Sequence, residues 1–362
     1  IFSMMKKRII IDADIPYIRN IFDKTAEVQY LKGKSINAEN AKSADALIIR
    51  TRTRCDEKLL QNSDVSFIGT ATIGTDHIDI DYCNSHGITV RNAPGCNANA
   101  VAQYVWNAII HFFYKETKNL QLVDTASFLN YLKRLKVGII GYGHVGKAVA
   151  RIAKSIGTDF YVYDPPLAKA LCDNSFFQLN EVLNSDIITV HTPLTSDGDY
   201  PTLHMIDENI FSTIESNGRK PLIINAARGG IIKEEVLLKH LEKGSISGCI
   251  IDCWENEPDI NKDVLSSAFI ATPHIAGYSI QGKYNATKQI VNELCTAFNY
   301  GSCEIDLLDI TQKEVKTPLE IVETFLTDDR LEEDTKRLKT DAENFEIQRN
   351  TYDYRNEIKL LS

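Results

Sequence analysis

An apolar run of strand length, followed at once by a glycine pattern, restricts the fold more than any other feature of the sequence. The run ends at Ile140, and Gly141, Gly143 and Gly146 then follow in the order G-x-G-x-x-G before the helical stretch Lys147–Ile156. Gly141 permits a tight turn, Gly143 lets a phosphate group approach the backbone, and Gly146 lets the helix pack closely on the strand. The pattern therefore predicts a strand, a turn and a helix whose N-terminus faces a bound phosphate.

A carboxylate lies where such a unit binds the ribose of a dinucleotide. The next apolar run, Phe160–Tyr163, ends at Asp164, which follows Gly141 by about twenty residues. The glycine pattern alone is also typical of an ordinary turn, but the carboxylate in this position favours a dinucleotide site. Pro165 and Pro166 come next, so no adjacent arginine is available for a 2′-phosphate, and NAD is preferred over NADP. We expect the cofactor to be bound by Gly141, Gly143, His144, Val145, Gly146 and Asp164.

Strand-length apolar runs recur along the chain, and each is followed by a polar turn and a helical stretch. The runs are Arg8–Ile11, Ala46–Ile49, Val65–Gly69, Leu135–Ile140, Asp159–Tyr163, Asp186–Val190, Pro221–Ile224 and Gly248–Ile251. This alternation predicts an α/β fold with parallel sheets that helices cover on both faces. The 362 residues are enough for two to three domains of roughly 150 residues each.

The runs fall into two groups, separated by a helical stretch at Asn97–Tyr114 that we expect to connect two α/β units. We expect a first α/β domain over residues 5–96 and a Rossmann-type NAD-binding domain over 97–276. Residues 301–362 differ in composition, with 16 acidic and 9 basic residues, which is also typical of a disordered acidic tail. They nevertheless contain an apolar stripe around Ile321 and Phe325, so we expect a small separate α+β domain used for oligomerisation.

Composition excludes several classes of protein. The net charge of −9 would repel a phosphate backbone, so nucleic acid is not an expected partner. No apolar run approaches the roughly 18 residues of a membrane helix, and the first residues lack the apolar core of a secretion signal. The eight cysteines contain no C-x-x-C pair, which indicates neither a metal site nor a disulfide scaffold. We therefore expect reduced thiols and a cytoplasmic protein that binds neither membranes nor nucleic acids.

Three polar segments follow later strands, at the sheet edge where open α/β folds bind ligands. They are Asn225–Gly230, Asp252–Pro258 and Thr272–Ser279. His274 suits a base that takes a hydroxyl proton during hydride transfer, and Glu257 could orient its imidazole and stabilise the protonated form. Arg228 could hold a substrate carboxylate and polarise the reacting oxygen. A surface ion pair, a solvated turn carboxylate and a loop histidine are the alternatives, and the combination beside a dinucleotide pattern favours catalysis.

These motifs resemble those of the D-isomer-specific 2-hydroxyacid dehydrogenase family. The glycine pattern and the three polar segments match the family motifs in order, over roughly residues 40–300. The resemblance implies that Arg228, Glu257 and His274 are the catalytic set. It also implies that residues 5–96, completed by about 277–300, form a flavodoxin-like substrate-binding domain.

Three further stretches resemble a member of this family that oxidises a phosphorylated 2-hydroxy acid and carries an extra C-terminal dimerisation domain. They are Gly69–Asp79, Ala93–Val101 and Phe345–Glu357. This resemblance implies a homodimer formed through residues 301–362. By the same likeness, the expected substrate contacts are Thr51, Thr72 and Tyr278. Further residues expected to line the NAD site are Thr192, Asp252 and Gly277.

Alternating arginines at the end of a strand agree with a phosphorylated substrate. Arg50, Thr51, Arg52, Thr53 and Arg54 follow the run Ala46–Ile49 in an otherwise acidic protein, and arginine suits phosphate recognition. A solvated basic loop is the alternative. The phosphate argument also serves a family member that acts on 3-phosphoglycerate, so that function stays open. A non-enzymatic, NAD-sensing protein similar to dehydrogenase-like corepressors stays open too, although the acidic charge and the arginines favour an enzyme.

Overall fold

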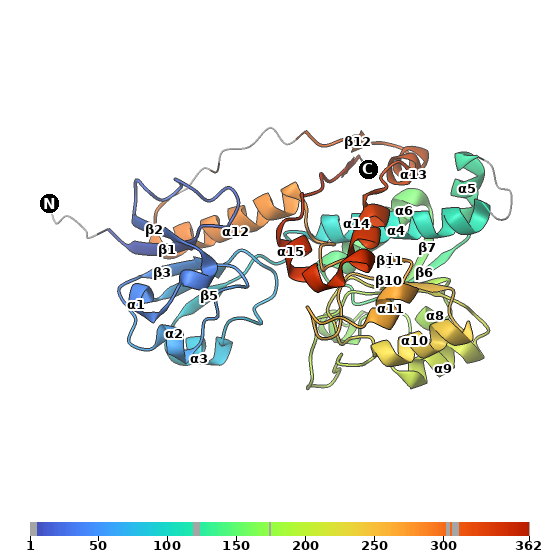
Figure 1. Cartoon of the computed structure of the whole chain (residues 1–362), viewed down its shortest axis with the longest axis horizontal. Helices are drawn as coiled ribbons and strands as arrows, with labels where there is room; N and C mark the ends of the chain where they lie inside the picture. The colour runs from blue at the N-terminus through green and yellow to red at the C-terminus, as the bar shows by residue number, and fades with distance from the viewer. Residues whose placement is uncertain (1–5, 119–123, 174, 302–304, 306–310, 362) are drawn as a thin grey trace. The chain divides into compact units, whose positions relative to one another are not determined.

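The computed structural model describes residues 6–118, 124–173, 175–301, 305 and 311–361. The chain divides into two compact units (Figure 1), the first made of Ile1–Asn97 with Ser279–Thr311 and the second of Ala98–Tyr278 with Gln312–Ser362. The boundaries expected from the sequence are 5–96 with about 277–300 for the first unit and 97–276 for the second. Each unit contains its own parallel sheet, so the predicted α/β class is confirmed.

The first unit is a five-stranded parallel sheet in the order β2-β1-β3-β4-β5. Its strands are β1 (Arg8–Asp12), β2 (Glu27–Leu31), β3 (Ala46–Ile49), β4 (Phe67–Thr70) and β5 (Thr89–Arg91). The short helices α1 (Ala38–Ala41), α2 (Glu57–Leu60) and α3 (Ile80–Ser85) contribute to one apolar core, and the long α12 (Ile280–Phe298) contributes to the other. A 3-10 turn, η1 (Gly33–Ser35), follows β2. The two edge strands β2 and β5 are partly exposed, which explains why no apolar run indicates them.

The second unit contains a six-stranded parallel sheet in the order β11-β10-β9-β8-β6-β7. The strands are β6 (Lys136–Ile140), β7 (Asp159–Tyr163), β8 (Ile187–Val190), β9 (Leu222–Asn225), β10 (Gly248–Ile251) and β11 (Ile270–Ala271). The helices are α4 (Ala98–Lys118), α5 (Thr125–Leu132), α6 (His144–Ile156), α7 (Pro165–Leu171), α8 (Leu179–Leu183), α9 (Glu208–Ser216), α10 (Glu234–Lys243) and α11 (Lys262–Ser267). The sheet order reverses between β6 and β8, and ligands of open α/β sheets bind at such a point.

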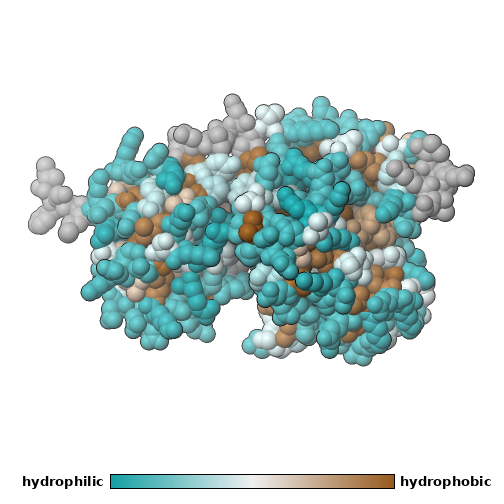
Figure 2. All heavy atoms as spheres, viewed as in Figure 1, coloured by the Kyte–Doolittle hydropathy of each residue, from teal (hydrophilic) through white to brown (hydrophobic). Residues whose placement is uncertain are grey.

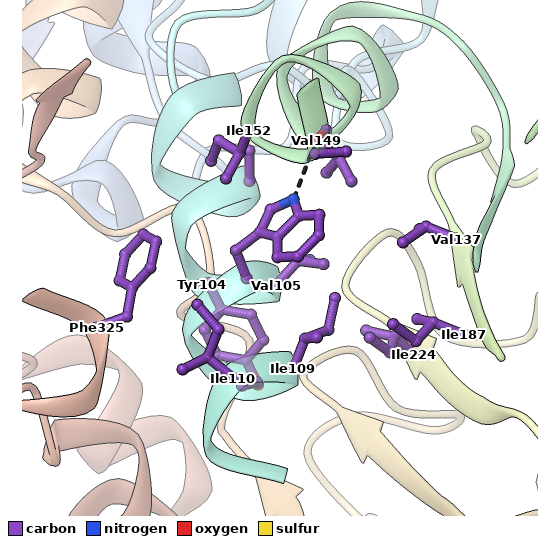
Figure 3. Packing of buried hydrophobic residues seen from close by; sticks show 14 of the residues in the cluster. Tyr104, Val105, Ile109, Ile110, Val137, Val149, Ile152, Ile187, Ile224 and Phe325 are labelled. Atoms are coloured by element: carbon purple, nitrogen blue, oxygen red, sulfur yellow. Dashed lines mark hydrogen bonds between the residues drawn. The ribbon is translucent and has the colours of Figure 1, made fainter. Parts of the chain in front are cut away.

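Helix α4 supplies Trp106 and Tyr104, two of the largest fully buried side chains of the described residues, and the helix belongs to the second unit. Tyr104, Val105 and Ile109 lie in the same apolar cluster as Val149 of α6 and Ile187 of the sheet (Figure 3). The indole N–H of Trp106 donates to the backbone oxygen of Val149 at 3.0 Å, the bond drawn as a dashed line in that figure. A buried tryptophan with its single donor satisfied fixes α4 against α6.

The C-terminal residues do not form the separate third domain that the sequence analysis expects. Their elements are β12 (Glu314–Val315), α13 (Pro318–Leu326), α14 (Arg330–Thr340), η2 (Ala342–Asn344), α15 (Phe345–Asn350) and β13 (Lys359–Leu360). Ile321 and Phe325 share a core with α4 and α6, whereas Leu338 and Phe345 join the core on the other side of the sheet. The predicted apolar stripe is buried, but it packs against the second unit and does not form the core of a separate domain.

The described helices include none that is both long enough and apolar enough to cross a membrane. On the face shown in Figure 2, hydrophilic residues cover most of the surface of each unit, and hydrophobic residues occur in small separate patches.

Candidate active site

The glycine loop and Asp164 together form one wall of a cavity of about 390 Å³. Gly141 has a left-handed backbone (φ 92°), and α6 begins at His144 with Gly143 as its N-cap. The carboxylate of Asp164 accepts hydrogen bonds from the backbone N–H of Tyr142 at 2.7 Å and of Leu167 at 2.9 Å. It therefore holds the loop after β6 beside the end of β7, as the predicted ribose-binding position requires.

Two buried polar atoms beside this cavity have no hydrogen-bond partner among the described residues: Nδ1 of His191 and Oγ1 of Thr192. Burial lowers the pKa of His191 to about 3, so its ring is neutral, and its Nε2 bonds the hydroxyl of Thr189 at 2.9 Å. Buried polar groups rarely stay unpaired, so these two atoms fit the polar groups of a bound dinucleotide. Thr192 is expected here from the sequence, whereas His191 is not, because only its place directly after β8 could indicate it.

Replacement of Gly146 by alanine should damage both the loop and cofactor binding. A Cβ atom at this position would lie 2.1 Å from the backbone oxygen of Gly141, so the turn must move. We expect Gly146→Ala to lower the melting temperature by about 4–8 °C and to weaken NAD binding at least about tenfold. Calorimetry and NADH fluorescence titration measure the two effects.

Gly143→Ala is the matched control for this change. A Cβ at Gly143 meets no other atom within 4 Å, so this variant should keep the melting temperature and lose only NAD affinity, because phosphate approaches the backbone there. Equal stability losses in the two variants would contradict this account of the loop.

A histidine and a carboxylate meet in a second cavity, of about 540 Å³. Nδ1 of His274 lies 2.9 Å from Oε2 and 3.1 Å from Oε1 of Glu257. The N–H of Trp254 also donates to Glu257, at 2.9 Å. Burial alone would raise the pKa of Glu257, but the hydrogen bond and charge of His274, the Trp254 N–H and the charge of Arg349 lower it. Glu257 is thus ionised, and Nε2 of His274 is the ring nitrogen left for a substrate.

The backbone around His274 is held in an uncommon conformation. His274 has a φ of 57°, and its N–H donates to the backbone oxygen of Asp252 at 2.9 Å. The carboxylate of Asp252 accepts from the N–H groups of Ile275 at 2.7 Å and Ala276 at 3.0 Å and from the hydroxyl of Thr272 at 2.6 Å. Asp252 is only 1% exposed and is not among the residues that line the two cavities. Its carboxylate braces the histidine loop, and the cofactor contact expected from the sequence stays a prediction.

Arg228 lines the same cavity as Glu257 and His274, so the structure brings the three predicted catalytic residues together. Its turn follows β9, and the side-chain amide of Asn225 donates to the backbone oxygens of Arg228 at 3.0 Å and Cys253 at 3.2 Å. A Cβ at Gly229 would lie 1.8 Å from the backbone oxygen of Trp254. Only glycine therefore allows the arginine loop to lie this close to the loop that carries Glu257.

Two other groups in this part of the unit were not singled out from the sequence. His204 contacts Glu255 through Nε2, and both residues line the second cavity. Sγ of Cys253, the carboxylate of Glu257 and Nδ1 of His274 lie within 4.8 Å of one another. The last two groups already bond each other, and burial raises the pKa of the Cys253 thiol well above its usual range. We therefore interpret the cluster as an acid–base pair beside a neutral thiol.

The predicted substrate contacts of the first unit lie after β3 and β4. Arg50 donates to the backbone oxygen of Asp14 at 3.0 Å, and Arg52 forms an ion pair with the Asp14 carboxylate at 3.8 Å. Thr51 between them is exposed, and the hydroxyl of Thr72 donates to the backbone oxygen of Gly74 at 2.9 Å. The two guanidinium groups thus both reach one loop residue, which keeps them close together.

Tyr278 and Gly277 follow the histidine loop in the second unit. The ring of Tyr278 makes edge contacts with Tyr352 and Tyr354, at 6.2 and 6.1 Å between centroids. Neither Tyr278 nor Gly277 is among the residues that line the two cavities.

The chain is similar to known dehydrogenases. The family model described as D-isomer specific 2-hydroxyacid dehydrogenase, NAD binding domain, matches residues 107–276. The erythronate-4-phosphate dehydrogenase of Bacteroides thetaiotaomicron is 40% identical over 361 residues, which is 98% of each chain. That of Porphyromonas gingivalis is 36% identical over 366 residues, 98% of this chain and 95% of its own. The solved structure of an NAD⁺-bound 3-phosphoglycerate dehydrogenase from Entamoeba histolytica superposes with a TM-score of 0.64 and 26% identity, covering 84% of this chain and 99% of that chain.

The matched NAD-binding region contains both the glycine loop and the cavity with Arg228, Glu257 and His274. The cofactor is NAD, and the protein is an NAD-dependent dehydrogenase. The chain therefore belongs to the D-isomer specific 2-hydroxyacid dehydrogenase family, on the branch that contains the erythronate-4-phosphate dehydrogenases.

Proposed function

We propose that the protein oxidises 4-phospho-D-erythronate to 2-oxo-3-hydroxy-4-phosphobutanoate with NAD, as a step of pyridoxal 5′-phosphate (vitamin B6) biosynthesis. The observation that carries the proposal is the hydrogen-bonded pair of His274 and Glu257 in one cavity with Arg228. A base, its orienting carboxylate and a guanidinium are what oxidation of a 2-hydroxy acid requires. The substrate itself is taken from the names of the relatives with the greatest coverage.

The proposed mechanism assigns one task to each of the three residues. His274 accepts the proton of the C2 hydroxyl at Nε2, because Nδ1 is bonded to Glu257. Glu257 holds the ring in this orientation and stabilises the imidazolium that forms. Arg228 pairs with the substrate carboxylate and polarises the oxygen at C2 as it becomes a carbonyl. When bound, NAD would supply the acceptor for the hydride, that is, for two electrons and one proton from C2. The hydroxyl proton passes to His274.

The contacts to cofactor and substrate are proposed residue by residue. The proposed cofactor contacts are Gly141, Gly143, His144, Val145, Gly146, Asp164, Thr192, Asp252 and Gly277. The cavity at the glycine loop supports Gly141, Gly143, Asp164 and Thr192. The proposed substrate contacts are Arg50, Thr51, Arg52, Thr72 and Tyr278. The shared contact of Arg50 and Arg52 with Asp14 supports a two-arginine phosphate site.

The proposal includes a homodimer, in the cytoplasm, formed through the C-terminal residues. Ile347 on α15 is 59% exposed, so this apolar side chain on the C-terminal segment is available for a subunit contact. Among the described residues, Cys55, Cys83, Cys172, Cys249 and Cys253 are free thiols, which suits a reducing compartment. Sedimentation of the wild type and of Ile347→Asp tests the dimer, and an unchanged dimer in the variant would place the contact elsewhere.

NADH formation by the purified protein tests the function. NAD is supplied with either 4-phospho-D-erythronate or 3-phospho-D-glycerate at matched concentrations, and absorbance at the NADH band is followed. A higher kcat/KM for the four-carbon substrate supports the proposal. Preference for the three-carbon substrate would keep the mechanism and replace the substrate. If the protein, once freed of prebound NADH, turns over neither, both proposed substrates are excluded and the substrate must be sought among other 2-hydroxy acids.

A further inference from the structure

The C-terminal helix α15 brings a second arginine to the acid–base pair. Nη1 of Arg349 lies 3.9 Å from Oε2 of Glu257 and 3.4 Å from Oε1 of Glu346, and its side chain is only 22% exposed. The guanidinium also forms a side-chain hydrogen bond with Tyr278. Burial would lower the pKa of Arg349, but the neighbouring Tyr278, Glu257 and Glu346 raise it, so the group is a permanent cation. The carboxylate that orients His274 therefore has a buried positive charge beside it.

The same segment holds the loop that follows His274. The guanidinium of Arg355 donates through Nη2 to the backbone oxygens of Ile275 at 3.3 Å and Ala276, and the backbone N–H of Arg355 donates to the backbone oxygen of Tyr278 at 3.3 Å. Arg355 is 9% exposed and lies 5.5 Å from the centroid of the Tyr104 ring. Because charge-assisted hydrogen bonds are strong, these contacts fix the loop of the catalytic histidine from the C-terminal side.

Packing makes this arrangement rigid. The side chain of Lys339 donates to the backbone oxygens of Ser266 at 3.1 Å and Ala268 at 2.6 Å, and the N–H of Ala271 in β11 donates to the Thr335 hydroxyl at 3.0 Å. Phe345, at the start of α15, is fully buried in the core of the unit. These bonds fix α14 to β11, the strand that leads into the His274 loop, and Phe345 at the start of α15 shares an apolar cluster with Leu338 of α14 and Ala271 of β11.

We propose that Arg349 is a positioning residue for catalysis, which fixes the Glu257 carboxylate and opposes protonation of the Glu257–His274 pair. The C-terminal segment is then part of the catalytic apparatus of its own chain as well as a candidate subunit contact. The inference rests on the proposed acid–base role of His274, but it does not depend on which 2-hydroxy acid is the substrate.

The charges around the pair set the sign of the expected effect. Besides His274, the titratable or charged groups facing Glu257 are Arg349, Glu234, the Cys253 thiol and, close to that thiol, Arg228. Oxidation needs the pair without the extra proton. Removal of the Arg349 cation makes that proton easier to bind, so activity is lost at a higher pH. Charges at 4–6 Å shift such equilibria by about one pH unit or more.

Three variants test the proposal. We expect Arg349→Gln to lower kcat about tenfold and to move the acid limb of kcat/KM upward by about one pH unit, with NADH affinity unchanged. Arg349→Lys keeps the charge and should restore the position of the limb but only part of kcat. Glu346→Gln removes an anion from the other side of the guanidinium and should move the limb downward, by less. Arg330 on α14 lies 3.9 Å from Asp328, and Arg330→Gln is the matched control, which should leave the profile unchanged.

The acid limb is read from the pH profile, and the ring of His274 is followed by NMR in the protein without substrate, so one readout does not require turnover. An unmoved limb in both Arg349→Gln and Glu346→Gln would overturn the proposal. A raised KM for the phosphorylated substrate with an unmoved limb would also overturn it, because Arg349 would then be a substrate ligand. If Arg349→Gln does not fold, the other two variants test the proposal. The acid limb should move to lower pH in Glu346→Gln and should stay at the wild-type pH in Arg349→Lys. A wrong substrate assignment can be told apart from a failure of this proposal, because the acid limb of the pH profile can be measured with any 2-hydroxy acid that the protein oxidises.

Discussion

His274→Asn is expected to lower kcat for substrate oxidation by about 10³-fold and to leave the affinity for NAD nearly unchanged. The asparagine amide can still donate to Glu257, so the loop should keep its shape, but the variant has no group that accepts the hydroxyl proton at the position of Nε2. The loss thus falls on the proton transfer. The cavity at the glycine loop does not include His274, which is why cofactor affinity should survive.

Steady-state kinetics and NADH fluorescence titration of the same preparation measure the two quantities for His274→Asn. His86→Asn is the matched control, since His86 is an exposed residue that stacks on Tyr82 in the first unit, and its kcat should equal that of the wild type. A kcat within tenfold of the wild type in His274→Asn would remove His274 from the role of base. A large loss of NADH affinity would show that the substitution disturbs the cofactor site instead.

The parts of the fold that the sequence predicted are those fixed by local pattern. Buried strands such as β8 and β10 are continuous apolar runs, and the glycine loop has a spacing that few other structures require. The edge strand β2, Glu27–Leu31, is partly exposed along its length and gave no such signal. The C-terminal stripe around Ile321 indicated burial correctly but not its partner, because an apolar face does not specify which surface covers it.

The candidate site likewise contains residues whose roles could be predicted from local sequence pattern and residues whose roles depend on the three-dimensional packing. Arg228, Glu257 and His274 were predicted from their positions after strands, because parallel strands place their carboxyl ends at one edge of a sheet. Asp252 also follows a strand, yet its carboxylate is taken up by Ile275 and Ala276, which only the backbone geometry shows. The contact of Arg349 with Glu257 joins residues far apart in the sequence, through the packing of α15, and no local pattern could indicate it.

The second large effect is expected at Arg228. Arg228→Gln removes the guanidinium from the three predicted catalytic residues. The variant therefore loses the ion pair with the substrate carboxylate and the stabilisation of charge on the C2 oxygen. The removal of one partner from a desolvated charge pair costs about 2–5 kcal/mol, and the loss of an electrostatic donor in the transition state costs a further factor of about 10²–10³ in kcat. We therefore expect kcat/KM to fall about 10⁴-fold, through both a higher KM and a lower kcat.

Arg228→Lys separates charge from geometry at this position. Lysine keeps the charge but has no planar pair of donors, so it should recover only part of the loss, mainly in KM. Arg219→Gln is the control, because Arg219 forms an ion pair with Asp186 at 2.8 Å at the other end of the sheet and should leave both constants unchanged. Full recovery by lysine would mean that Arg228 acts as a point charge. A loss confined to kcat in Arg228→Gln would mean that Arg228 does not bind the substrate carboxylate, and its role would then be limited to the charge on the C2 oxygen.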